Sequence, residues 1–351
     1  MKVFYKSPFV IADISLNLFD FADLEKISLM ESAMFLIDEA KSCGVDGVMF
    51  QSYSSEKLIS RDSTTFEELG IESPNDYFDL FKKYDSLGVG EFRKLAEYCR
   101  EIGMVFLSTP NDFESVDYLD EFMDIYKIAS SDLTNIPFIK HVASKNKPIL
   151  LSTGGATIVE IKQAVRAIED VSTSDVVIMH SVLSFPTKYD DANLLMIKDL
   201  AENFPEYEIG YSDHTETDEN MMVLTTAFNY GATVLEKHFT FDKKIDSLDS
   251  SYAMDGDDVI NFKENILFLS KINGRKNKQP LICESLTRKK VRKSIVADSD
   301  IKKGETIKES DITFKRPGIG ISPSRVDEVI GNVAIQDISK DTIIKFEMLE
   351  N

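Results

Sequence analysis

The feature of the sequence that most constrains the fold is an alternation between short apolar runs and longer segments with helical spacing, from about residue 8 to residue 272. The strand-like runs are FVIADIS, DGVMFQSY, MVFLSTP, DIYKIASSD, KPILLSTGG, DVVIMHSV, YEIGYSDHT and ATVLEKHFT. A helix-like segment follows each run, and glycines stand where several of these helices would end: Gly44, Gly103, Gly231 and Gly274. Eight strand–helix units predict a (β/α)8 TIM barrel. A doubly wound parallel sheet is the alternative.

Two stretches depart from this alternation. Residues 54–89 separate the second expected strand from its helix, and a long loop at the carboxyl end of a strand is often part of a binding site. After Gly274 the chain becomes basic, in RKNKQ and RKKVRKS, and then shows short strand-like runs broken by KKGE, RPGIG and IGN. We therefore predict a barrel domain over 1–285, a linker over 286–293 and a small, mostly β domain over 294–351.

Composition and charge limit the classes of function. The 351-residue chain carries a formal net charge of −20, which opposes binding to nucleic acid and to anionic membranes. No apolar stretch is long enough to span a membrane, and the N-terminus has no signal-peptide pattern. Three scattered cysteines are typical of a reducing compartment, so a cytoplasmic protein is expected. An anionic substrate would need a local concentration of positive charge.

Polar residues gather where the expected strands end, which is the catalytic face of such barrels. These residues are Asp13, Gln51, Lys127, Ser130, Asp132, Ser152, Ser184, Ser212, His214, Glu236 and His238. Because adjacent strands lie about 5 Å apart, the imidazoles of His214 and His238 are placed to bind one divalent ion. Two buried, hydrogen-bonded histidines are the alternative. His180 is expected to pack in the barrel, and His141 lies on a predicted helix.

Lys127 is expected at the same rim, on the fourth strand. It could bind an anion or act as a Schiff-base nucleophile. Three serines, Ser130, Ser152 and Ser212, can donate hydroxyl groups to a phosphate, and STGG leads into a helix whose N-terminus favours an anion. This combination favours phosphate binding.

These residues occur in motifs that resemble the sialic acid synthases, which include N-acetylneuraminate, legionaminic and pseudaminic acid synthases and spore-coat homologues. The motifs are YKIASSD, PILLSTGG, SFPTKYDD, GYSDHT, LEKHFTF with SLDSSYAMD, and KRPGIGI, and the last belongs to a segment that resembles their antifreeze-like (SAF) domain. The resemblance implies condensation of phosphoenolpyruvate with an open-chain N-acyl hexosamine. It further implies a divalent metal, typically Mn²⁺ with Mg²⁺ or Co²⁺ as alternatives, held by His214 and His238.

The resemblance also assigns roles to the other residues. Lys127, Ser130, Ser152 and Ser212 would bind phosphoenolpyruvate. Asp249 corresponds to an acidic residue near the sugar, and Arg316 to an arginine delivered into the partner barrel of a domain-swapped homodimer. With this assignment we expect Asp13, Asp132 and Asp249 to be catalytic and Gln51 and Ser184 to bind substrate.

Several positions differ from the family pattern. The first strand reads DISLNLFDF, with Asp13 where the family has glutamate and without the His and Gly of the family's Asn-His-x-Gly sequence. Met49 stands where the family has lysine. Asp132 replaces another glutamate, and Leu183 replaces an asparagine. Two alternatives to the sialic acid synthase activity follow: a synthase that uses a different aldehyde, and a sugar- or anion-binding homologue without catalysis.

Overall fold

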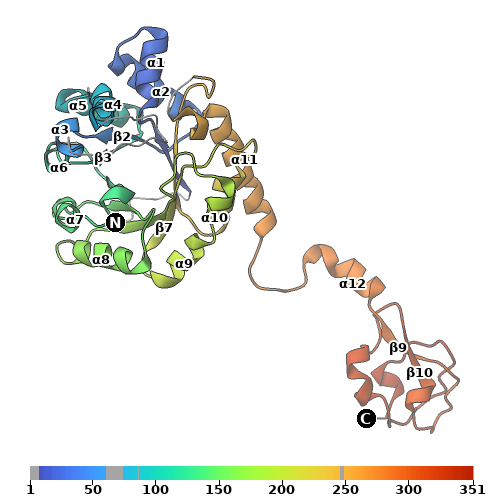
Figure 1. The fold of residues 1–351 in the computed structure, drawn as a ribbon. Coiled ribbons are helices and arrows are strands. Elements are labelled where there is room, and N and C mark those ends of the chain that lie inside the picture. Colours follow the sequence, from blue (N-terminus) through green and yellow to red (C-terminus); the bar gives the residue numbers. More distant parts are fainter. Residues whose placement is uncertain (1–7, 61–73, 86, 246–248, 351) are drawn as a thin grey trace. The chain divides into compact units, whose positions relative to one another are not determined.

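Eight parallel strands close into a barrel in chain order (Figure 1). The structure, a computed structural model, describes residues 8–60, 74–85, 87–245 and 249–350. The strands are β1 (Phe9–Asp13), β2 (Gly47–Ser52), β3 (Val105–Pro110), β4 (Tyr126–Ile128), β5 (Ile149–Ser152), β6 (Val176–His180), β7 (Glu208–Asp213) and β8 (Val234–His238). β8 pairs with β1, with Asp13 opposite His238. The predicted barrel is confirmed, and the doubly wound sheet is wrong because that sheet would leave two edge strands unpaired.

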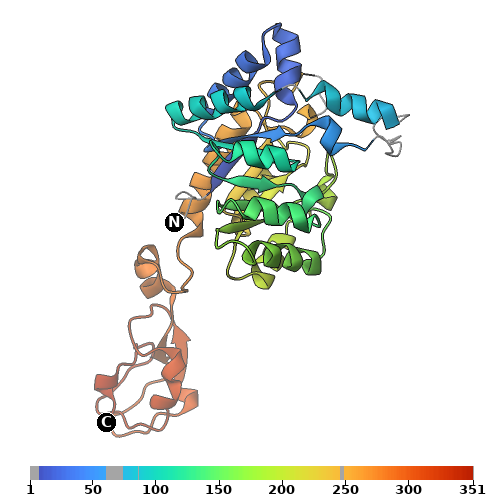
Figure 2. The same ribbon diagram turned by 90° about the vertical axis from the view of Figure 1, so that its left-hand side faces the viewer.

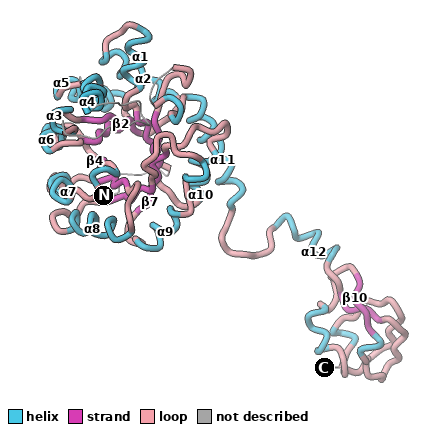
Figure 3. Tube along the Cα trace, in the orientation of Figure 1, coloured by secondary structure: helices cyan, strands magenta, loops and turns pink. Residues whose placement is uncertain are grey.

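Helices surround the ring of strands, as Figure 3 shows in cyan around magenta. They are α1 (Asn17–Glu25), α2 (Leu29–Ser42), α3 (Ser55–Leu58), α4 (Pro74–Lys83), α5 (Val89–Ile102), α6 (Phe113–Leu119), α7 (Ile136–Ala143), α8 (Ile158–Glu169), α9 (Met196–Asn203), α10 (Met222–Asn229) and α11 (Gly256–Asn273). The sequence did not predict α1, whose N-cap residue Leu16 makes no side-chain cap hydrogen bond. The C-cap of α5, Gly103, has a φ of 69°, a conformation that glycine adopts without strain.

The barrel interior changes from apolar to polar along its axis. At one end it is filled by an apolar cluster of Phe9, Ile11, Met49, Leu107, Ile125, Leu150, Val177, Met179 and Val234. Successive side chains along a strand point to opposite faces, so residues two positions further along these strands also point inward. They include Asp13, Lys127, Ser152 and Glu236, and all four are buried. A larger apolar cluster fills the layer between strands and helices, which flank the strands in Figure 2.

The chain divides into two compact units between Ile272 and Asn273. The predicted linker, 286–293, coincides largely with helix α12 (Ser285–Val291), which belongs to the second unit. That unit contains an antiparallel pair of strands, β9 (Ser294–Ala297) and β10 (Ile312–Lys315), and its own apolar core. Most of its remaining backbone forms turns and isolated bridges, so its regular β-structure is limited to two strands. Within the described ranges, no helix is both long and apolar enough to cross a membrane.

Candidate active site

A cavity of about 470 Å³ opens in the first unit, among residues at the carboxyl ends of the strands. Nine of the residues predicted from the sequence line it: Asp13, Gln51, Lys127, Ser130, Ser152, Ser212, His214, His238 and Asp249. The insertion after β2 contributes Leu58, Ile59, Phe81 and Tyr84 to the wall. The part of this insertion at 61–73 lies outside the described residues. The strand ends therefore bring most of the predicted residues into one cavity.

The two predicted metal ligands face each other across the end of the barrel. The ring centroids of His214 and His238 are 5.7 Å apart. The Nδ1 atom of His214 lies 3.1 Å from the carbonyl oxygen of Val182, and that of His238 lies 2.9 Å from Asp249 Oδ2. These acceptors place a proton on each Nδ1, so Nε2 is the ring nitrogen through which each histidine, in its neutral form, would bind a metal.

Carboxylates surround His238 on two sides. Asp249 accepts hydrogen bonds from His238 and from the hydroxyl of Tyr252, whose ring centroid is 4.8 Å from that of His238. On the other side Asp13 Oδ2 lies 3.9 Å from His238 Nε2. Asp13 is itself oriented by a hydrogen bond of 2.6 Å from Ser15. This arrangement concentrates negative charge where a cation would bind.

Burial and these neighbours shift the protonation of the two histidines in opposite directions. Burial, helped by the positive charge of His238, lowers the pKa of His214 to about 4. Burial would also lower the pKa of His238, but Asp249 and Asp13 outweigh it and raise that pKa to about 9. Burial raises the pKa of Asp13 to about 6. His214 is therefore neutral near pH 7, the form in which imidazole coordinates metals.

Lys127 forms a buried ion pair with Glu236 inside the barrel, with side chains only 4% and 5% exposed. Ser212 donates a hydrogen bond of 2.7 Å to the other carboxylate oxygen of Glu236. Burial would raise the pKa of Glu236, but Lys127 and Ser212 outweigh it and lower that pKa. Glu236 was predicted at the rim, but its ion pair with Lys127 was not predicted from the sequence. Glu236 stands two residues before His238, on the same face of β8, and this spacing is the sequence signal that its side chain points into the barrel.

Ser130 and Ser152 line the same cavity as Lys127 and Glu236. Ser130 accepts a hydrogen bond of 3.0 Å from the backbone amide of Gly154, which follows Ser152 by two residues. Met49, where the family pattern has a lysine, is buried at the cavity, and Thr109 Oγ1 lies 3.3 Å from its sulfur. Lys127 is consequently the sole lysine or arginine among the described residues that line the cavity.

Three predicted site residues are not among the residues that line the cavity. Asp132 is half-buried in a 3-10 turn and accepts a hydrogen bond of 2.9 Å from Asn135. Ser184 is exposed, and its hydroxyl donates to the carbonyl oxygen of Pro186 in its own loop. Arg316 is exposed in the second unit. Among the remaining histidines, His180 is buried on the outer face of the barrel, 2.9 Å from the carbonyl oxygen of Ala192.

The outer wall of the cavity is mostly apolar and aromatic. It consists of Leu16, Tyr53, Leu58, Ile59, Phe81, Tyr84, Leu183, Phe185 and Tyr252. Sequence reasoning missed Tyr53, Phe185 and Tyr252 as members of the site. For Tyr252 a signal existed, since it follows Asp249 by three residues and can hydrogen-bond back across a single turn. The cavity thus has a polar floor and an apolar mouth.

Comparison with known proteins decides the family. The sequence profile of the NeuB family matches residues 36–278, and that of the SAF domain matches residues 292–350. The chain belongs to the NeuB family. Its relatives include sialic-acid-type sugar acid synthases, so the resemblance drawn from the motifs is confirmed.

Individual relatives match over most of their length. The N,N'-diacetyllegionaminic acid synthase of Campylobacter jejuni is 33% identical over 315 residues, which cover 88% of this chain and 93% of that protein. The N,N'-diacetyllegionaminic acid synthase of Legionella pneumophila is 31% identical over 328 residues, 92% of this chain and 91% of that protein. A crystal structure of the N-acetylneuraminic acid synthetase of Leptospira borgpetersenii with citrate superposes with a TM-score of 0.67 at 29% identity, covering 80% of this chain and 90% of that one.

Proposed function

We propose that this NeuB family member condenses phosphoenolpyruvate with the open-chain aldehyde of an N-acyl amino sugar. The products are a sialic-acid-type 2-keto sugar acid and inorganic phosphate, which makes the protein a transferase of surface-polysaccharide biosynthesis. The observation that carries this proposal is that the facing pair His214 and His238 shares one cavity with Lys127 and three serine hydroxyls.

Phosphoenolpyruvate would bind at Lys127 on the floor of the cavity. The hydroxyl groups of Ser130 and Ser152 also line the cavity and offer hydrogen-bond donors for the phosphate, while the Ser212 hydroxyl donates to Glu236 beside them. A Schiff-base lysine must present a free amine, whereas Lys127 is engaged in an ion pair with Glu236. The arrangement therefore favours anion binding by Lys127 over the aldolase alternative.

The residues around the two histidines fit a divalent metal. Their ring centroids lie 5.7 Å apart in one cavity, and the carboxylates of Asp13 and Asp249 beside His238 make that region attractive to a cation. Among the described residues, no group of three or more His, Cys, Asp or Glu is arranged to hold a metal, so His214 and His238 would leave other positions to water and substrate. A metal bound there, with Mn²⁺ as our proposal, would supply Lewis-acid polarisation of the aldehyde oxygen.

The chemistry balances with the groups in the cavity. The C3 carbon of phosphoenolpyruvate bonds to the aldehyde carbon, and the aldehyde oxygen takes up a proton. Water adds at C2, and the bond from C2 to the phosphate oxygen breaks to leave the keto group. Asp13 and Glu236 line the cavity and are placed to stabilise positive charge at C2 and to accept a proton from the water. Holding both substrates in one enclosed site supplies the required proximity.

The apolar mouth of the cavity favours an unphosphorylated sugar. Aromatic and aliphatic side chains there, such as Tyr53, Phe81 and Phe185, suit N-acyl methyl groups and ring carbons. A sugar phosphate would need a second cationic site, and the described lining residues offer only Lys127, which we assign to phosphoenolpyruvate. An unphosphorylated N-acyl hexosamine is thus the proposed substrate.

The test is phosphate release from phosphoenolpyruvate with Mn²⁺ and a panel of aldehyde sugars. N-acetylmannosamine, its 6-phosphate and N-acylated deoxy sugars separate the proposals. Turnover with an unphosphorylated N-acyl sugar supports both the condensation reaction and the assignment of the sugar. Turnover restricted to the 6-phosphate overturns only the assignment of the sugar. Tight phosphoenolpyruvate binding without turnover on any sugar would favour the non-catalytic homologue.

A further inference from the structure

A second buried ion pair lies on the outer face of the barrel, between Asp213 and Lys237, the residues that precede His214 and His238 in the chain. β7 and β8 are paired in register, with Ser212 opposite Glu236 and Asp213 opposite Lys237. Because side chains alternate along strands, the first pair points into the cavity and the second points away from it. Lys237 Nζ lies 2.7 Å from Asp213 Oδ2, and each of these two side chains is only 1% exposed.

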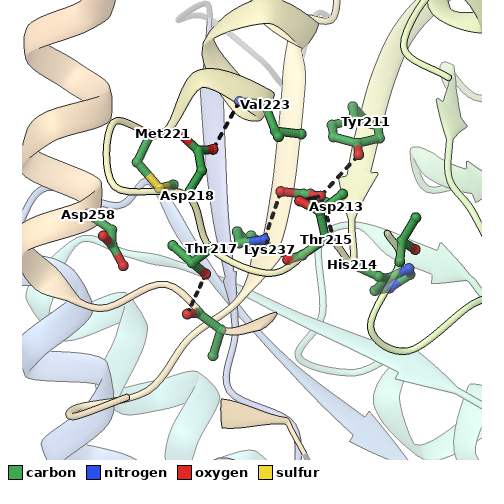
Figure 4. Close-up of polar contacts among 12 residues, drawn as sticks. Tyr211, Asp213, His214, Thr215, Thr217, Asp218, Met221, Val223, Lys237 and Asp258 are labelled. Atoms are coloured by element: carbon green, nitrogen blue, oxygen red, sulfur yellow. Dashed lines mark hydrogen bonds and ion pairs between the residues drawn. The ribbon is translucent and has the colours of Figure 1, made fainter. Parts of the chain in front are cut away.

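The ion pair is the centre of a hydrogen-bond network that includes Asp213 and Thr215, the residues on either side of His214 in the sequence (Figure 4). Asp213 Oδ1 accepts three hydrogen bonds: 2.9 Å from the amide of Thr215, 2.8 Å from its hydroxyl and 3.0 Å from the hydroxyl of Tyr211. Lys237 Nζ also donates to the carbonyl oxygen of Thr215, at 2.7 Å. The residues on both sides of His214 are thereby fixed to the residue that precedes His238.

The energetics of buried ion pairs argue against a purely stabilising role. Removing two charges from water costs several kcal/mol per ion, and well-packed apolar residues are often as stabilising or more so. What a buried pair supplies is a defined geometry, because its hydrogen bonds are satisfied in one arrangement. Here that arrangement connects the ends of β7 and β8, where the two histidines lie.

We propose that Asp213 and Lys237 are positioning residues that hold His214 and His238 at the spacing required to share one divalent ion. The inference rests on the proposed function, because it takes these histidines as metal ligands. Metal ligands need support to within about 0.5 Å, and loss of residues that orient ligands typically lowers metal affinity by about 10- to 100-fold. Neither Asp213 nor Lys237 lines the cavity, so the proposed effect acts through the histidines.

The test replaces both charges together, in the full-length variant Asp213→Asn/Lys237→Gln, so that no buried charge is left alone. The matched control is Asp120→Asn/Lys147→Gln, which removes an ion pair of 2.7 Å where β5 begins, at the opposite end of the barrel. Mn²⁺ affinity is measured by titration calorimetry on each protein, together with circular dichroism and the melting temperature. Thr215→Val, an isosteric change that removes one hydrogen bond to Asp213, provides a variant that is expected to fold in any case.

We expect Mn²⁺ affinity to fall by about 10- to 100-fold in the Asp213/Lys237 variant and by a smaller factor in Thr215→Val, with the control unchanged. Activity of the Asp213/Lys237 variant should recover in part at high Mn²⁺, which a merely structural defect would not produce. Wild-type Mn²⁺ affinity in a folded Asp213/Lys237 variant, or in Thr215→Val if the double variant does not fold, overturns this inference alone. If the wild-type protein binds no divalent ion, the metal centre and this inference fail together.

Discussion

Replacing Glu236 by glutamine probes the charge balance at the floor of the cavity. The side chains of Lys127 and Glu236 are 4% and 5% exposed, so the variant leaves a lysine charge buried without its partner. Breaking a buried pair from one side costs about 3–5 kcal/mol. In a folding unit of this size each kcal/mol lowers the melting temperature by about 2–4 °C, so we expect a decrease of about 6–20 °C.

Phosphoenolpyruvate should reverse much of this loss. Its phosphate would supply the negative charge that Glu236→Gln removes, so saturating phosphoenolpyruvate should raise the melting temperature of the variant more than that of the wild type. The assay is thermal unfolding followed by circular dichroism, with and without the ligand. Glu121→Gln is the matched control, because Glu121 pairs with Arg93 on the surface and its loss should cost at most about 1 kcal/mol.

Two results would refute this reasoning. If the Glu236→Gln variant has the same melting temperature as the wild type, the ion pair with Glu236 does not stabilise the buried charge of Lys127 in the ligand-free protein. An equal shift by phosphoenolpyruvate in variant and wild type would show that the anion does not bind at Lys127. Lys127→Met gives the complementary measurement, since it should abolish the ligand-induced shift.

Three further outcomes are expected. His238→Ala should remove Mn²⁺ binding detected by calorimetry while the far-ultraviolet circular dichroism spectrum stays the same; a retained affinity would contradict the metal assignment. Chelation of the metal should weaken phosphoenolpyruvate binding by tenfold or more, about 1.4 kcal/mol, measured by calorimetry before and after Mn²⁺ is restored. Mixed subunits of Arg316→Ala and His214→Ala should regain part of the activity that each variant lacks, and failure despite demonstrated subunit exchange would argue against the domain-swapped dimer.

The sequence predicts the barrel and the floor of its cavity because strand periodicity determines both. Once the strands are located, alternation of side chains places residues such as Lys127, Ser152 and Ser212 on the inner face. Their convergence in the structure follows from closure of the barrel. The pattern also contained Glu236, but periodicity gives the direction of a side chain and not its partner, so the ion pair with Lys127 was not foreseen.

Two residues predicted in the loops, Ser184 and Asp132, do not line the cavity, for a physical reason. The orientation of a side chain in a loop is determined by local hydrogen bonds, and the periodicity of strands and helices does not reveal these bonds. Ser184 donates to Pro186 within its own turn, and Asp132 accepts from Asn135. The side chain of Tyr252, in contrast, lines the cavity, and its hydroxyl donates a hydrogen bond to Asp249. The aromatic wall required the three-dimensional placement of the insertion after β2.

The charges of the cavity explain how a protein with a net charge of −20 could bind a strongly anionic substrate. The described lining residues carry the carboxylates of Asp13, Glu236 and Asp249 against two positive charges: the ammonium of Lys127, which Glu236 already neutralises, and the imidazolium of His238, which lies beside Asp249 and Asp13. Met49 adds no charge where the family pattern has a lysine. The positive charge that accompanies phosphoenolpyruvate must therefore come largely from a bound ion or from beyond these residues. A divalent ion between His214 and His238 would provide it at the centre of the site, which is why we expect anion binding to depend on the metal.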